Sequence, residues 1–154
     1  MQLTQKETSL LKDLKEQEQL CVEKYGKYST DANDGQLKNL FSQICQTEKQ
    51  HLDSITQIMN GTVPSMQSGG GHQQKQLSFA PTYKAGDTSS NRQKDSFLCS
   101  DSLSSEKHVS SSYNTSIFEF KDTNIRDTLN HIQKEEQQHG EQIYNYMAQN
   151  GMYS

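Results

Sequence analysis

Two short motifs in this 154-residue chain have the composition of a metal site. Each is a Glu-x-x-His sequence, formed by Glu48 and His51 in one case and by Glu136 and His139 in the other. Side chains three residues apart lie on the same face of a helix, where a carboxylate and an imidazole can bind one metal ion. A single motif of this kind is common on solvated helix faces, so its meaning depends on what the rest of the chain places beside it.

The sequence repeats itself with an offset of 88 residues and no gap. This offset superposes the two motifs, and it also superposes Glu18 on Glu106. Acidic and imidazole side chains are therefore among the positions that the two copies share. An internal repeat of helical hairpins indicates a four-helix bundle with a pseudo-twofold axis. Further matched pairs are Tyr25 and Tyr113, Asp34 and Asp122, Leu37 and Ile125, Lys38 and Arg126, and Ile44 and Ile132.

Each copy has the pattern of two helices separated by a break. In the first copy, apolar or small residues spaced three or four apart run through residues 3–32 and again through residues 37–59. The polar sequence at residues 31–35 interrupts them, and Asp34 is suited to cap the second helix. In the second copy, the helical pattern resumes near Lys94 and breaks again at residues 121–124.

We therefore predict an all-α protein, a four-helix bundle built from two duplicated helical hairpins. The hairpins occupy residues 1–60 and 93–154, and together they form one bundle domain. Residues 61–92, rich in Gly, Ser and Gln, are expected to be a flexible crossover linker between them. The linker is long enough for the hairpins to pair within one chain or to swap between two chains.

The positions of the breaks predict where the acidic residues meet. The breaks lie at residues 33 and 121, which are the midpoints of the pairs Glu18/Glu48 and Glu106/Glu136. In an antiparallel hairpin, residues equidistant from the turn lie at the same height, here about 22 Å along the helices. Six candidate residues on the apolar stripe thus converge at one level of the core: Glu18, Glu48, His51, Glu106, Glu136 and His139.

Four carboxylates buried together repel one another, and burying a single unpaired charge costs several kcal/mol. Two divalent cations would neutralise them. An oxygen-rich site with one nitrogen per metal suits iron or manganese better than zinc. One Glu on each of two helices and Glu-x-x-His on each of the other two is a known di-iron or di-manganese pattern. We therefore predict a di-iron or di-manganese centre held by these six residues; the alternative is a polar core layer held by protons and hydrogen bonds.

Other reactive side chains are less specific. Tyr25 and Tyr113 lie seven residues from Glu18 and Glu106, and we expect them to be packed core aromatics, with redox activity as the alternative. Cys21 and Cys45 are equidistant from residue 33 and are expected to be small core residues, with a redox pair as the alternative. The role of Cys99 is open. Three histidines without a matched partner in the repeat are expected to be exposed: His72, His108 and His131.

Composition limits the class of protein. With a net charge of −4 and no basic cluster, nucleic acid is not expected as a partner. No apolar run approaches the roughly 20 residues of a membrane span, and the first residues have no hydrophobic signal region. We therefore expect a soluble protein made in the cytoplasm that does not contact a membrane. Three widely spaced cysteines are too few for a disulfide framework or a zinc knuckle.

The second half, residues 101–153, resembles the coat F family of spore coat proteins from endospore-forming bacteria. The resemblance lies in residues 103–108 (LSSEKH), 113–119 (YNTSIFE), 132–139 (IQKEEQQH) and 144–153 (YNYMAQNGMY). It implies a ferritin-like fold and a place in the protein shell of the spore. The first half resembles the N-terminal hairpin of that family more loosely. The six-residue pattern is also similar, more distantly, to that of rubrerythrin and manganese catalase.

Two functions follow from these resemblances. One is a structural spore coat protein, made in the mother-cell cytoplasm, with other spore coat proteins as partners and with a homo-oligomer left open. The other is a di-metal oxidoreductase that removes peroxide, in which the six residues bind the metals. Metal storage, or stabilisation of the fold by metal, is intermediate between them. The sequence does not decide whether the protein is an enzyme.

Overall fold

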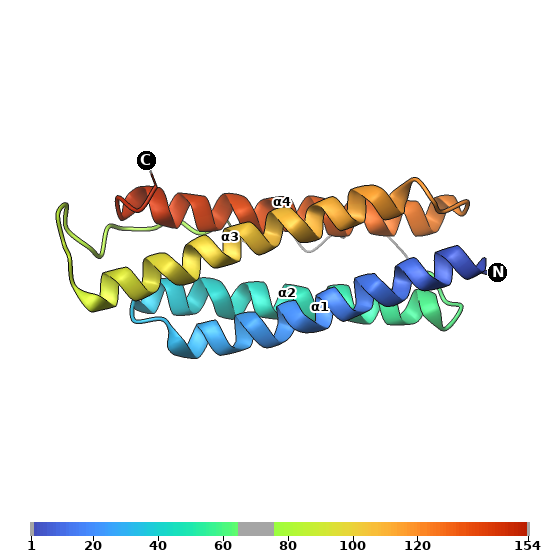
Figure 1. Cartoon of the computed structure of the whole chain (residues 1–154), viewed down its shortest axis with the longest axis horizontal. Helices are drawn as coiled ribbons and strands as arrows, with labels where there is room; N and C mark the ends of the chain where they lie inside the picture. Colours follow the sequence, from blue (N-terminus) through green and yellow to red (C-terminus); the bar gives the residue numbers. More distant parts are fainter. Residues whose placement is uncertain (1, 65–75, 154) are drawn as a thin grey trace.

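The computed structural model describes residues 2–64 and 76–153, and over these residues it contains four helices and no strand. The helices are α1 (Gln5–Asp31), α2 (Gly35–Met59), α3 (Ser90–Ile117) and α4 (Thr123–Gln149). They lie side by side along the long axis of the molecule (Figure 1). The prediction of an all-α four-helix bundle is confirmed.

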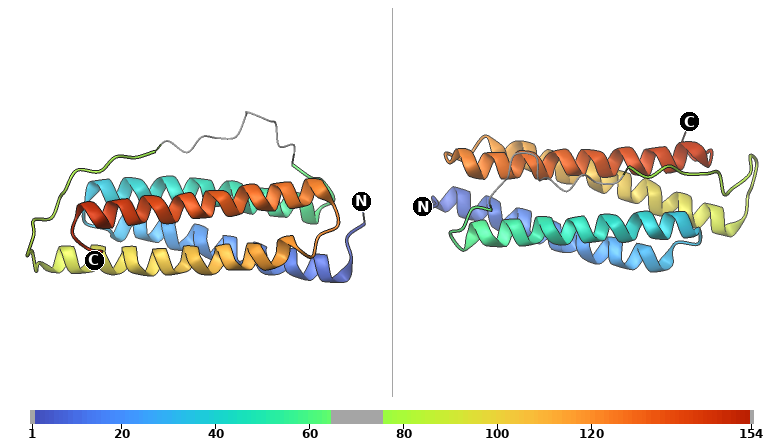
Figure 2. Two further views of the ribbon diagram at one scale, coloured as in Figure 1. Left: turned by 90° about the horizontal axis from the view of Figure 1, so that it is seen from above. Right: turned by 180° about the vertical axis from the view of Figure 1, so that it is seen from behind.

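The helices pair as two antiparallel hairpins. Helix α1 packs along α2 and α3 packs along α4, while α1 also contacts α3 and α2 contacts α4 within the same chain. The two hairpin turns lie at opposite ends of the bundle, so the connection from α2 to α3 must return along the full length of about 40 Å (Figure 2). Its described part runs outside the helices. Residues 65–75 of the predicted linker, with its three consecutive glycines and His72, lie outside the described residues.

Side-chain caps fix where the helices begin. Asp34 accepts a hydrogen bond from the backbone N–H of Gln36, as predicted, and its repeat equivalent Asp122 caps α4 in the same way. Helix α3 begins at Ser90, four residues before the position at which the apolar pattern resumes, because the Ser89 side chain caps it. A cap sets a helix start independently of the apolar pattern.

Each hairpin also holds the turn of the other with a buried acid. Glu7 of α1 accepts a hydrogen bond from the backbone N–H of Lys121 in the α3–α4 turn, at 3.2 Å. Asp95, its equivalent in the repeat, accepts backbone N–H groups of Asn33 and Asp34 in the α1–α2 turn, at 2.8 and 2.9 Å. These three hydrogen bonds tie the hairpins together at both ends of the bundle.

Apolar side chains fill the core above and below its centre. Phe41, Ile44 and Ile55 of α2 are fully buried, as are Leu129 and Ile143 of α4. Full burial of an aliphatic or aromatic side chain contributes about 1.5–3 kcal/mol, so these layers hold the helices in register around the polar layer between them. None of the described helices is long and apolar enough to span a membrane.

Candidate metal centre

The structure brings all six predicted residues together in the middle of the bundle. Every helix contributes: α1 and α3 carry one glutamate each, and α2 and α4 each carry a Glu-x-x-His motif. None of the six is more than 3% exposed. The residues are Glu18, Glu48, His51, Glu106, Glu136 and His139.

The six residues form two overlapping groups. In each group, the candidate ligand atoms lie within 4.8 Å of one another. Glu48 and Glu136 belong to both groups, whereas Glu18 and His51 belong to one and Glu106 and His139 belong to the other. Each group draws on both hairpins, so neither hairpin contains a complete group.

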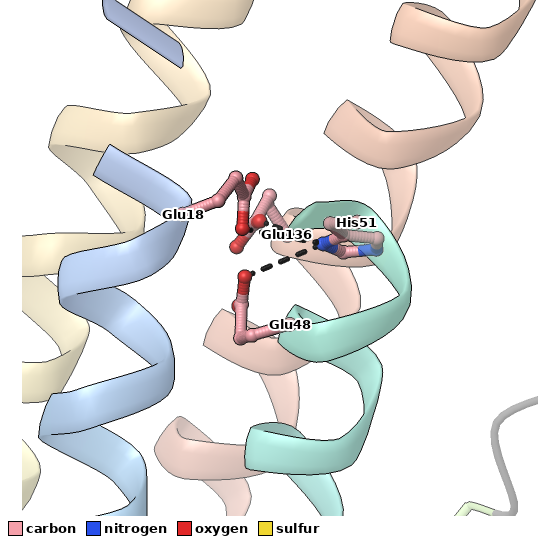
Figure 3. Close-up of side chains that lie close together, drawn as sticks. All are labelled: Glu18, Glu48, His51 and Glu136. Carbon is pink, nitrogen blue, oxygen red and sulfur yellow. Dashed lines mark hydrogen bonds and ion pairs between the residues drawn. The ribbon is translucent and has the colours of Figure 1, made fainter. Parts of the chain in front are cut away.

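Both imidazoles direct the same ring nitrogen at the carboxylates. His51 Nδ1 lies 3.1 Å from Glu136 Oε1, 3.3 Å from Glu48 Oε2 and 3.8 Å from Glu18 Oε2. Figure 3 shows these three carboxylates converging on the His51 ring from α1, α2 and α4. His139 Nδ1 lies 3.0 Å from Glu48 Oε1 and 3.6 Å from Glu106 Oε1. The rings are stacked with their centroids 6.0 Å apart.

Two tyrosines join the cluster across the hairpins. The Tyr25 hydroxyl donates a hydrogen bond to Glu106 Oε1, and the Tyr113 hydroxyl donates one to Glu18 Oε1, each at 2.5 Å. Both tyrosines are fully buried, as expected of core aromatics. Sequence spacing placed each tyrosine about 10 Å along the helix from the glutamate of its own copy, but it did not identify this contact with the other copy.

A fifth acid, Glu135, which the sequence analysis did not predict, lies directly behind His51. Glu135 Oε1 is 3.1 Å from His51 Nε2 and 2.9 Å from His131 Nε2. Glu135 is 6% exposed, and the His131 side chain is 32% exposed. The expectation that His131 is exposed was therefore wrong, because its pairing with Glu135 draws the ring against the bundle; His108 is exposed as expected.

The two outer glutamates, Glu18 and Glu106, have raised pKa values, which favours their protonated forms. Burial raises the pKa of Glu18 well above its ordinary value, and the charge of Glu48 raises that pKa further. Burial likewise raises the pKa of Glu106, to about 8, with an additional effect from the charge of Glu136. A buried carboxyl group next to an ionised one keeps its proton because two adjacent negative charges repel.

The pKa shifts of the two shared glutamates and of the two imidazoles instead favour their charged forms. Burial raises the pKa of Glu48 and of Glu136, but hydrogen bonds from the outer glutamates and the imidazoles outweigh burial and hold both pKa values below the ordinary one. Burial lowers the pKa of His51 and of His139, but hydrogen bonds to the carboxylates raise both well above 6.5. Two imidazolium charges therefore balance two carboxylate charges.

Four buried carboxylate oxygens depend on the cluster alone. Within the described residues, one oxygen of each cluster glutamate is buried without a hydrogen-bond partner outside the cluster. Buried polar atoms normally have a hydrogen-bond partner, and hard oxygen atoms next to imidazole nitrogens are ligands for a divalent cation. The residues therefore fit a metal ion, and the cluster could hold one. The atoms are Glu18 Oε2, Glu48 Oε1, Glu106 Oε2 and Glu136 Oε2.

The three cysteines are free and buried. Cys45 donates its Sγ–H to the backbone carbonyl of Val22 at 3.4 Å, so it is a core residue with a backbone partner. Cys21 lines a cavity of about 260 Å³ between α1 and α3, opposite Val109, its equivalent in the repeat. Burial, followed by the charges of the cluster glutamates, raises the pKa of the Cys21 thiol, so this thiol is a poor nucleophile.

Comparison with known proteins gives a match for the C-terminal hairpin. Residues 94–154 match the Coat F domain family. This segment covers all of α4 and most of α3, and it carries Glu106, Glu136 and His139 of the cluster. No curated protein and no solved structure matches the chain. The C-terminal hairpin is therefore similar to the Coat F domain.

Proposed function

We propose that the chain is a structural spore coat protein whose ferritin-like bundle holds a di-iron or di-manganese centre in its core. The family match of the C-terminal hairpin supports the coat role. The observation that carries the metal centre is the sharing of Glu48 and Glu136 between two buried ligand groups. Other spore coat proteins are the expected partners, and the protein is expected to be made in the mother-cell cytoplasm before it enters the coat.

The donor set favours iron or manganese. Four carboxylates would balance two divalent cations; Glu48 and Glu136 belong to both ligand groups, and each group would offer one imidazole nitrogen. Zinc prefers nitrogen and sulfur ligands in a tetrahedral shell, whereas iron and manganese accept this oxygen-rich set. Bound iron or manganese would supply a positive charge that neutralises the core and an electron acceptor or donor for redox chemistry.

Elemental analysis tests the metal centre. We expect protein purified without chelator to contain about two iron or manganese ions per chain, as in other carboxylate-bridged bundles. Glu18→Gln removes one ligand and should lower this content, whereas Glu16→Gln, at an exposed position on the same helix, should leave it unchanged. Wild-type protein without metal after growth in iron and manganese would contradict the proposal.

Fractionation of spores tests the coat role. The protein should be extracted from spores only under conditions that solubilise the coat. Recovery from the cytosol of vegetative cells alone would contradict this role. The result is independent of metal content, so the two parts of the proposal are tested separately.

Two observations favour a second function, a di-metal oxidoreductase that consumes peroxide. The hydroxyls of Tyr25 and Tyr113 bond directly to candidate ligands, where a phenol could pass an electron and a proton. The cavity lined by Cys21 and Val109 lies between α1 and α3, the helices that carry Glu18 and Glu106. Metal-loaded wild-type protein should then consume peroxide, and the double variant Tyr25→Phe/Tyr113→Phe should be slower with its metal content unchanged. Absence of peroxide consumption would leave the structural role alone.

A further inference from the structure

The two halves of the candidate metal centre differ behind the histidines. On the His51 side, the ring nitrogen facing away from the cluster contacts the Glu135 carboxylate at 3.1 Å. The position equivalent to Glu135 in the first hairpin is Thr47, whose side chain carries no charge. The difference is one of residue type at matched positions of the repeat.

The atoms used by His51 fix the direction of this contact. Its Nδ1 is the nitrogen among the shared carboxylates, so it is the nitrogen available to a metal. When Nδ1 is a ligand, Nε2 carries the ring proton and donates it in a hydrogen bond to Glu135. A carboxylate in this position orients the ring and makes the imidazole a stronger ligand.

Glu135 is itself held from a second side. His131, one turn earlier on α4, contacts the same Glu135 oxygen at 2.9 Å. The equivalent of His131 in the first hairpin is Gln43, and Thr47 donates its hydroxyl to the Gln43 backbone carbonyl at 3.3 Å. The pair formed by His131 and Glu135 is therefore a feature of the second hairpin.

We propose that Glu135 makes the two metal positions unequal, so that the position held by His51 binds its metal more tightly and fills first. Glu135 is a positioning residue, because it acts through His51 and lies outside the two ligand groups. This inference rests on the proposed di-metal centre and extends it to the order of loading.

Titration of the metal-free, full-length protein with Mn²⁺ by calorimetry tests the proposal. The wild type should show two resolved binding steps. Glu135→Gln keeps the size of the side chain but removes its charge, and it should weaken the tighter step about 10–100-fold and leave the other step unchanged. Glu141→Gln, which removes an exposed charge from the same helix, should change neither step.

Variants that keep only one of the two cluster histidines show which metal position Glu135 affects. In His139→Gln, the remaining step should weaken when Glu135→Gln is added. In His51→Gln, adding Glu135→Gln should have no effect. A merely structural role of Glu135 would weaken Mn²⁺ binding in both backgrounds alike, and this result would overturn the proposal.

The outcomes separate this inference from the proposed function. If the wild type binds two Mn²⁺ with equal affinity, unequal loading is wrong and the di-metal centre stands. If Glu135→Gln leaves both steps unchanged, Glu135 does not make the positions unequal, and the proposal fails while the di-metal centre stands. If the wild type binds no Mn²⁺, the di-metal centre fails and the inference fails with it.

Discussion

The two hairpins share their polar interior but differ in the apolar core around it. Leu14 of α1 corresponds to Ser102 of α3, and Ile58 of α2 corresponds to Tyr146 of α4, although all four side chains are buried. Buried apolar positions tolerate exchange because neighbouring side chains can adjust to fill the volume. The acids, histidines and tyrosines of the central layer match between the copies, because each of these groups has a partner in the other hairpin.

This comparison shows how the site depends on both halves. The family match covers the second hairpin, yet that hairpin supplies only half of the cluster. The contacts Tyr25 to Glu106 and Tyr113 to Glu18 cross between the hairpins in both directions. A polar layer of this kind holds the two hairpins together, because side chains of each hairpin are the hydrogen-bond partners of side chains in the other.

The largest expected effect comes from removing a shared carboxylate. Glu48→Gln removes the carboxylate nearest to His139, which is 3.0 Å from its Nδ1, while His51 keeps Glu135 and Glu136. An uncompensated buried charge costs about 3–5 kcal/mol, so the free energy of unfolding of the metal-free protein should fall by about that amount. Urea denaturation in the presence of chelator measures it.

The repeat predicts that Glu136→Gln has the same effect as Glu48→Gln. Metal content should fall below two ions per chain in both variants, because each carboxylate belongs to both ligand groups. Glu16→Gln, at an exposed position, is the control. A loss of less than about 1 kcal/mol, the range of an exposed ion pair, in only one of the two variants would show that the hairpins do not contribute equally.

Backbone periodicity made the bundle and the level of the site predictable from the sequence. The breaks at residues 33 and 121 and the three-residue spacing within each motif place the six side chains at one height, whatever the neighbouring side chains are. Helix starts were less predictable. Ser89 caps α3 ahead of its apolar pattern, and a cap depends on a few local atoms.

Contacts between helices could not be predicted in the same way. Glu135 is next to Glu136 and reads as part of a solvated face, and its contact with His51 depends on how α4 lies against α2. The bond from Tyr25 to Glu106 depends on the separation of α1 from α3. Asp95 and Glu7 are a matched pair in the repeat, but their partners are backbone N–H groups, which carry no residue-type signal.

An intermediate effect is expected from pH. In the metal-free protein, the pKa values of Glu18, Glu106, His51 and His139 all lie above those of unfolded chains. Between about pH 5 and pH 8 the unfolded chain loses protons that the folded protein keeps, so stability falls as pH rises. The lowered pKa values of Glu48 and Glu136 act only below about pH 4.5 and do not change this sign.

We therefore expect metal-free protein to melt roughly 5 °C lower at pH 8 than at pH 5.5. Metal-loaded protein should not show this fall, because the cations replace the protons. Differential scanning calorimetry across this range measures both curves. Glu18→Gln and Glu106→Gln should each flatten the metal-free curve, one from each hairpin. A melting temperature that rises with pH in metal-free wild type would show that the cluster does not hold its protons.

The most local expected effect distinguishes the two ends of the bundle. Asp95 accepts two backbone N–H groups of the α1–α2 turn and the Tyr83 hydroxyl, and it is fully buried. Glu7 accepts the backbone N–H of Lys121 in the α3–α4 turn and that of Thr4 in its own cap. Asp95→Asn places amide hydrogens against buried donors and should cost about 2–3 kcal/mol, whereas Glu7→Gln should cost about 1 kcal/mol.

Urea denaturation measures both losses, with Asp127→Asn and Glu16→Gln as controls at exposed positions. Amide hydrogen exchange shows at which residues each variant loses protection. Asp95→Asn should speed exchange at residues 33 and 34, and Glu7→Gln should speed it at residue 121, because each acid holds the turn of the opposite hairpin. Equal losses, or faster exchange throughout the bundle in either variant, would mean that the ends do not act as separate clamps and that the central polar layer alone joins the two copies.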